Sequence, residues 1–244
     1  MTVKSGLIGC VALCGWLMAG QVFAECTPPA VTGQWDFSVC KDWPVDPALT
    51  ITAVSKFVPD KVYAKGEKIG SYDLDLSVWS ADESTSLATY RQTAAFSTDA
   101  IELESVELDT ARYKLTPKLR AFGVRAMFRG SSSVNPLNET VLSLYVKEGN
   151  NLRPVLDRLV VYRFSGEWDG NCAGDRGTTV RTIEMGKTNS HGYADLIVKS
   201  VTTGLTGEGP PDTCEIKTTN YKPELTTLHY DGKSYVLPNG FQGL

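Results

Sequence analysis

The chain has 244 residues, of which 42% are hydrophobic, and a formal net charge of −4 at pH 7. This length is enough to bury the core of one domain or of two small ones. The slight acidity, with no lysine/arginine run longer than two residues, argues against a nucleic-acid or anionic-membrane partner, which would require a basic face.

The first 24 residues are predicted to be a cleavable secretory signal peptide. Lys4 precedes an apolar stretch without charge up to Glu25, and Val22-Phe23-Ala24 has the small-residue pattern of a cleavage site. The stretch is shorter than the about 20 residues that a membrane span needs, and charges interrupt every later one, so no membrane span is expected. A lipoprotein is the alternative, but Cys10 has almost no hydrophobic segment before it and Cys26 follows a glutamate.

Residues 25–244 are predicted to form one exported domain, with four cysteines at positions Cys26, Cys40, Cys172 and Cys214. Such cysteines most simply form two disulfides, and three pairings are open. Proximity favours Cys26 with Cys40 and Cys172 with Cys214. A zinc site is the rival interpretation, but the chain has no CxxC pair and only two histidines, so we expect no metal and no cofactor.

The two-residue period of half-buried strands dominates the chain, and no stretch has a convincing helical period. Apolar residues alternate with polar ones over residues 72–78 and 122–128, while Trp79 has the opposite phase and is expected on the other face. Within residues 101–108 the phase changes at Ser105, as a β-bulge or a short turn between two strands would require. These patterns predict an all-β domain.

Turn residues predict that the strands are joined as antiparallel hairpins. Asp231-Gly232 lies between two tyrosines, and residues 148–151 separate two further apolar runs. Residues 130–138 are the best candidate for an internal boundary, and residues 203–213 are expected to form a flexible loop tethered by Cys214. Both a propeller-like and a β-sandwich architecture would produce this pattern.

Residues 187–198, which include Asn189-Ser190-His191-Gly192-Tyr193-Ala194-Asp195-Leu196, resemble a degenerate FG-GAP or VCBS-type repeat. This β-propeller motif usually binds calcium through carboxylates at alternate positions of its turn. The equivalent positions here are Lys187, Asn189 and His191. The resemblance therefore implies a turn at Gly192, a remaining acid at Asp195 and core positions after it, but no metal.

The wider chain, with residues 109–113, 120–125 and 166–170, resembles uncharacterised exported proteins of Gram-negative bacteria. This resemblance implies a periplasmic location and no particular activity.

Strong catalytic signals are missing from the sequence. There is no Gly-x-Ser-x-Gly elbow, zinc-binding helix, phosphate-binding loop or dinucleotide fingerprint. His191 and His229 are interpreted as exposed or packed side chains rather than as catalytic bases. The best acidic cluster surrounds a tryptophan that resembles a sugar-stacking platform, although solvated acids are also expected in such a glycine-rich loop: Glu167, Trp168, Asp169 and Asp175.

The leading hypothesis is that of a soluble periplasmic, non-enzymatic protein that binds another envelope protein. An inhibitor or immunity protein that plugs the basic cleft of an envelope-attacking enzyme would suit an acidic exported domain. The alternative is a polysaccharide-acting hydrolase, which needs only two carboxylates across a cleft and would use Glu167, Asp169 and Asp175. A structural or storage role, or a calcium-dependent propeller, is the third hypothesis.

Overall fold

The computed structural model describes residues 26–60, 68–80 and 84–244. The predicted signal peptide, residues 1–24, lies outside the described part. The described residues form strands and one short 3₁₀ turn, η1 (Pro211–Thr213). The strands are β1 (Phe37–Asp42), β2 (Leu49–Pro59), β3 (Gly70–Ser80), β4 (Ser86–Thr98), β5 (Ile101–Asp109), β6 (Ala121–Gly130), β7 (Leu137–Glu148), β8 (Asn151–Trp168), β9 (Gly174–Ser190), β10 (Tyr193–Glu208), β11 (Glu215–Asn220) and β12 (Glu224–Leu228).

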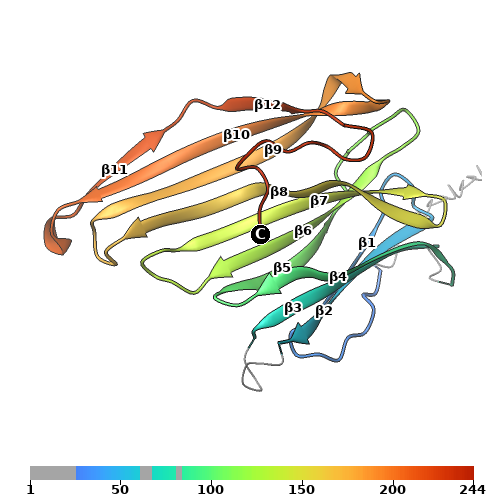
Figure 1. Ribbon diagram of the computed structural model, residues 1–244, viewed down its shortest axis with the longest axis horizontal. Helices are drawn as coiled ribbons and strands as arrows, with labels where there is room; N and C mark the ends of the chain where they lie inside the picture. Colours follow the sequence, from blue (N-terminus) through green and yellow to red (C-terminus); the bar gives the residue numbers. More distant parts are fainter. Residues whose placement is uncertain (1–25, 61–67, 81–83) are drawn as a thin grey trace, which may run out of the picture.

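All the strands belong to one sheet, which confirms the all-β prediction (Figure 1). Its order is β1-β2-β3-β4-β8-β7-β6-β5, and β9 joins β8 to β10, which pairs in turn with β11 and β12. The paired strands are antiparallel except for β4 and β8, which meet in parallel at a single bridge between Thr89 and Asn151. The predicted antiparallel hairpins are therefore present, but β4 and β5 do not pair with each other, and β11 and β12 each pair with β10.

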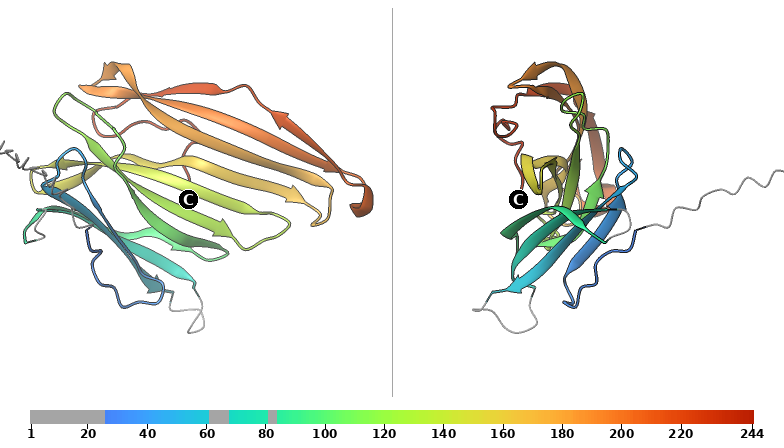
Figure 2. Two further views of the ribbon diagram at one scale, coloured as in Figure 1. Left: turned by 180° about the vertical axis from the view of Figure 1, so that it is seen from behind. Right: turned by 90° about the vertical axis from the view of Figure 1, so that its right-hand side faces the viewer.

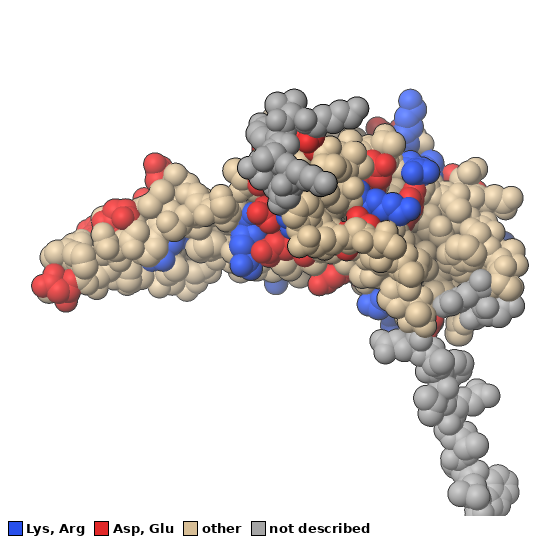
Figure 3. Space-filling model, turned by 90° about the horizontal axis from the view of Figure 1, so that it is seen from below, with Lys and Arg blue, Asp and Glu red and all other residues tan. Residues whose placement is uncertain are grey.

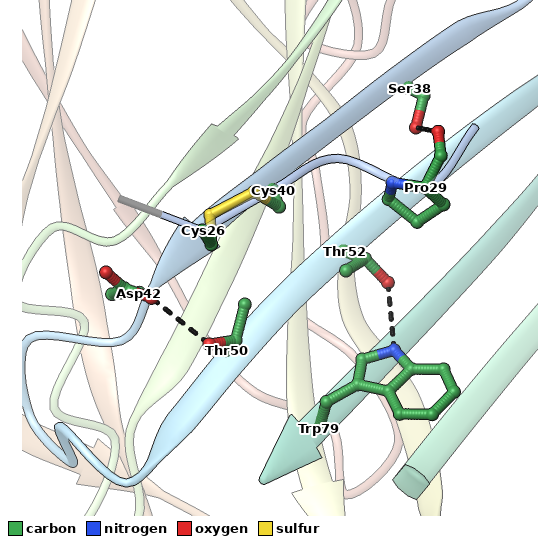
Figure 4. Close-up of a disulfide and its surroundings, with 8 residues drawn as sticks. All are labelled: Cys26, Pro29, Ser38, Cys40, Asp42, Thr50, Thr52 and Trp79. Atoms are coloured by element: carbon green, nitrogen blue, oxygen red, sulfur yellow. Dashed lines mark hydrogen bonds between the residues drawn. A yellow bond between two sulfur atoms is a disulfide. The ribbon is translucent and has the colours of Figure 1, made fainter. Parts of the chain in front are cut away.

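The first hydrophobic core lies between β1–β4 and β5–β7, which pack face to face as in a sandwich. The alternating residues of β3 and β6 supply most of it: Tyr72, Leu74, Leu76, Val78, Phe122, Val124, Ala126 and Phe128. Trp79 lies on the opposite face of β3, as its phase predicted, and its Nε1 donates to Thr52 Oγ1 at 3.2 Å (Figure 4). This arrangement corresponds to the sandwich alternative.

The second core lies on the other face of β7. Leu142, Leu144 and Val146 pack there against β8, β10 and the C-terminal segment. Residues 141–146 of β7 are thus buried on both faces, and for this reason the strand is a continuous apolar run rather than an alternating one. The C-terminal tail continues along β8, where Phe241 O accepts from Val160 N at 2.8 Å.

The loop expected over residues 203–213 is wrong for residues 203–208, which belong to β10 because they pair with β9 on one side and with β11 on the other. The other predicted turns have their expected local structure. The phase change at Ser105 is a bulge inside β5, at which the register with β6 skips Glu104. Asp231 Oδ1 accepts hydrogen bonds from the backbone of Lys233 and Ser234, which closes the tight turn after β12. Residues 131–136, within the candidate internal boundary, connect the neighbouring strands β6 and β7 of the same sheet.

Both favoured disulfides are present, Cys26–Cys40 and Cys172–Cys214. The first ties the N-terminal segment to β1, where Ser38 Oγ also donates to Pro29 O at 2.6 Å (Figure 4). The second joins the β8–β9 turn to the segment before β11. The sequence interpretation of the cysteines is confirmed.

The outer parts of β8, β9 and β10, together with β11, extend beyond the two cores as a projecting sheet (Figure 1). We call this part, residues 162–182 and 199–221, the wing. Seen from behind, no other described strand lies across its outer part (Figure 2). The Cys172–Cys214 disulfide closes its far end.

Candidate functional site

An apolar row crosses the sheet from the body onto the wing. The strand register places Met127, Thr140, Tyr162, Val180 and Val201 side by side on β6 to β10. Residues directly opposite each other in adjacent strands share one face, so these five side chains form a continuous line. The four apolar members, which we call the apolar row, are 36–43% exposed.

More apolar side chains lie on the same face of the wing. Leu225 lies opposite Lys199, which points to the same face of β10 as Val201. Ile216 lies opposite Gly207 near the tip. Their side chains are 70% and 49% exposed. Half-buried Phe164 and Leu205 lie between these residues and the row by register. A soluble protein rarely exposes so many aligned apolar residues unless the surface meets a partner.

The far end of the wing is strongly acidic. Residues 167–175 and 208–215 contain six acidic residues and no lysine or arginine. The Cys172–Cys214 disulfide holds these two segments together, although 42 positions separate its cysteines in the chain. We call these segments the acidic tip. Carboxylate groups cover the protruding end of the molecule in the space-filling view (Figure 3).

Two like-charged pairs face each other within the acidic tip. Glu167 is directly opposite Asp175, and Glu208 is directly opposite Glu215. Like charges in this position destabilise a sheet. Within the described ranges, no lysine or arginine forms an ion pair with any of the four carboxylates. A cationic partner would therefore relieve a repulsion that the isolated chain retains.

The structure separates the acidic cluster that the sequence singled out. Glu167 and Asp175 line one hollow of about 920 Å³, whose floor includes Gly177 and Gly204. Trp168 follows Glu167 in the same strand and so points to the opposite face of the wing. Trp168 is therefore close to the two acids in sequence but does not line their hollow.

Trp168 and Asp169 have local structural partners. The Trp168 ring lies under the Arg176 guanidinium, 4.3 Å away, and its Nε1 donates to Ser133 O at 2.6 Å. The Asp169 carboxylate accepts the backbone N–H groups of Asn171 and Cys172, each at 2.8 Å. These hydrogen bonds lower the pKa of Asp169. Asp169 thus forms the β8–β9 turn and is held as a carboxylate, a state that does not suit a general acid.

The structure brings together a serine, a histidine and an aspartate that the sequence reasoning did not connect. Asp195 is buried, and Oδ1 accepts from Ser190 Oγ at 2.7 Å and lies 3.2 Å from His229 Nδ1. Ser190 Oγ lies 3.2 Å from the same nitrogen. A hydrolytic triad instead places the serine and the aspartate on different ring nitrogens, so this group does not form the triad relay.

The turn beside this group has the geometry of a two-residue hairpin. His191 and Gly192 both have positive φ, 48° and 87°, which the hairpin loop requires. Gly192 therefore makes the turn that the motif resemblance implied, and Leu196 and Val198 are core residues. The FG-GAP or VCBS relationship itself stays a prediction. Nowhere in the described chain do three or more histidine, cysteine, aspartate or glutamate side chains form a group that would hold a metal ion.

Asp195 is expected to make stability sensitive to acid. Burial alone would raise its pKa, but hydrogen bonds from Thr188 and Ser190, with His229 beside it, lower it below the ordinary value. Because the pKa is lower in the folded state, the carboxylate stabilises the fold above the ordinary pKa of about 3.9, and this contribution is lost as pH falls through the folded value. Asp195→Asn should cost about 1.5–3 kcal/mol at pH 7.

Urea unfolding of the wild type and Asp195→Asn between pH 7 and pH 2 checks this expectation. The difference in unfolding free energy should narrow below about pH 4, where the unfolded wild type begins to take up a proton that the folded state does not yet bind. A difference that stayed constant down to pH 2 would show that the charge of Asp195 does not contribute.

Comparison of the chain with protein-family models, curated proteins and solved structures gave no match. Over residues 26–60, 68–80 and 84–244, no helix has the length and apolar character needed to cross a membrane. The candidate site therefore rests on the geometry of the wing alone.

Proposed function

We propose that this protein is a non-enzymatic binding protein of the periplasm that contacts another envelope protein through the wing. The predicted signal peptide and the two disulfides support an oxidising compartment outside the cytoplasm. The observation that carries the proposal is the exposed apolar row on an uncovered sheet face. Aromatic and aliphatic side chains of this kind supply the buried centre of protein interfaces.

The acidic tip supports a partner with a basic surface. Its six acids lie at the protruding end of the molecule, where they can enter a cleft (Figure 3). Complementary charge accelerates association and selects the partner, while apolar contacts supply most of the binding free energy. This division of roles suits an inhibitor or immunity protein that plugs the basic cleft of an envelope-attacking enzyme.

Capture of Gram-negative envelope proteins on the oxidised chain, read by quantitative mass spectrometry, tests the proposal. Val180→Asp should reduce capture of the specific partner at least about tenfold, because about 1.4 kcal/mol of lost binding is sufficient for that change. Val58→Asp is the matched control, since Val58 is 44% and Val180 43% exposed. Val58 lies on β2, away from the wing, and its replacement should leave capture unchanged.

The charge of the tip is tested in the same assay. Glu208→Gln with Glu215→Gln should slow association and weaken its dependence on salt. Asp75→Asn with Glu107→Gln removes the same charge on β3 and β5, away from the wing, and should have little effect. Equal capture by all variants and the wild type would contradict the proposed surface. The hydrolase is the second candidate, because Glu167 and Asp175 share one hollow. It would be favoured if the wild type hydrolysed an envelope glycan and the variant Glu167→Gln with Asp175→Asn did not.

A further inference from the structure

The ladder between β8 and β9 ends before β9 does. Their last pair on the inner side is Tyr162 with Val180, but β9 continues to Ser190 while bonded to β10 alone. The part of β8 before Tyr162 has another partner on this side, because Val160 N donates to the C-terminal tail. From residue 181 onward, none of the described strands lies beside the edge of β9 that faces away from β10.

A hollow of about 560 Å³ lies along this free edge. Five consecutive β9 residues, 181–185, line it. Alternate residues of a strand point to opposite faces, so a consecutive run indicates that the strand presents its edge to the hollow. Half-buried Ile183 and Met185 supply the accessible apolar part of the lining, and Asp109 and residues 111–113 lie there too. The volume falls within the about 300–1,000 Å³ range of ligand pockets.

The backbone along this edge is available for pairing. Among the described residues, the backbone of 181–189 makes no hydrogen bond outside its ladder with β10. A free edge of this kind is a template for another extended chain. The Arg181 side chain fills only the start of the gap, where Nη1 donates to Val160 O at 3.0 Å.

The charges around the hollow favour an acidic ligand. Arg112 and Arg181 line it without an ion pair among the described residues, whereas Arg125 is paired with Asp109 at 2.6 Å. Glu184 is the remaining acid of the lining. The lining therefore has an excess of positive charge, which a ligand carboxylate would neutralise. Arg112 is exposed, so its guanidinium is accessible to such a group.

We propose that residues 181–185 of β9 form a strand-addition site for an extended acidic peptide of a partner protein. A segment of about five residues, roughly 17 Å at ~3.4 Å per residue, pairs with the free edge. One face of the segment places an apolar side chain beside Ile183 and Met185, and an acidic side chain reaches Arg112. Main-chain bonds supply affinity and the hollow supplies specificity, as in other complexes formed by strand addition. The site uses neither the apolar row nor the acidic tip and does not rest on the proposed function.

A positional-scanning library of acetylated, amidated pentapeptides is the probe, titrated against the oxidised chain by fluorescence anisotropy. The best peptides should alternate apolar residues with other residues and should contain aspartate or glutamate. Two N-methylated versions of each of these peptides are then made, one for each alternating set of backbone amides. Because only one edge of the peptide faces β9, methylation of one set should weaken binding at least about tenfold and methylation of the other should not.

Arg112→Glu should weaken the acidic peptides by about tenfold or more, and Lys56→Glu, a charge reversal on an exposed residue of β2, should not. Hydrogen exchange should slow at the free-edge amides of 181–185 when the peptide is bound. The proposal is overturned if no peptide binds more tightly to the wild type than to Arg112→Glu, or if both methylated sets bind equally well. Preference for an oligosaccharide or a basic peptide over every acidic one would also overturn it.

Discussion

Replacing Arg163 with alanine is expected to destabilise the protein by about 3 kcal/mol or more. Glu139 on β7 is 1% exposed and lies directly opposite Arg163 on β8. Arg163 Nε donates to Glu139 Oε2 at 2.6 Å, and the backbone N–H of Leu244 donates to Oε1 at 2.9 Å. Without the guanidinium, a buried carboxylate loses its counter-charge, which typically costs about 3–5 kcal/mol. We expect the lower end of this range, because the Arg163 side chain is 36% exposed and water can partly replace it.

Guanidinium chloride unfolding of two variants separates the charge from the packing. Glu139→Leu with Arg163→Met removes both charges and should be less destabilising than Arg163→Ala alone. Because the Leu244 amide donates to Glu139 Oε1, the double variant removes its acceptor and should speed hydrogen exchange there more than Arg163→Ala does. A cost below about 1 kcal/mol for Arg163→Ala would mean that the carboxylate of Glu139 is adequately solvated without it.

Loss of the Cys172–Cys214 disulfide is expected to have a comparably large effect. Its cysteines are 42 positions apart, and chain entropy gives about 4 kcal/mol for a closed loop of that length. The corresponding value for Cys26–Cys40, 14 positions apart, is about 3 kcal/mol. Cys172→Ala with Cys214→Ala should therefore lower the unfolding midpoint more than Cys26→Ala with Cys40→Ala.

The two disulfide variants also differ in what they should do to binding. The Cys172–Cys214 pair holds the two segments of the acidic tip together, so its loss should weaken partner capture even under conditions where the chain is folded. The Cys26–Cys40 pair lies on β1 and should leave capture unchanged in a folded variant. Equal losses of capture in both would indicate a general loss of stability and not a role for the tip.

Much of the fold could be predicted from the sequence because its first core uses one face of each strand. The alternation over residues 72–78 and 122–128 is visible in the sequence and matches the buried side chains of β3 and β6. The cysteine spacing likewise led to both disulfides. The double burial of β7 gives a continuous apolar run, which has no period and so carried no information about its two faces.

The wing could not be predicted in the same way. In the sequence, Val180 and Val201 cannot be distinguished from ordinary buried strand residues. Whether other elements cover a strand face depends on parts of the chain that are far away in sequence. The acids of the tip come from segments about 40 residues apart, so they form one surface only after the disulfide and the ladder are in place. One feature was available in advance: Glu167 and Trp168 are consecutive, and strand alternation already predicts that they lie on opposite faces.

The single bridge between Thr89 and Asn151 has a consequence for how the chain folds. Every other pairing within β1–β4 joins consecutive strands, as do those from β5 to β11. Each half can therefore form its hairpins from contacts that are local in sequence, which favours fast folding. The pairing of β4 with β8 and the docking of the two halves around the first core are the steps that require distant parts of the chain to meet. Assembly of the two meanders, rather than formation of the hairpins, is thus expected to limit the folding rate.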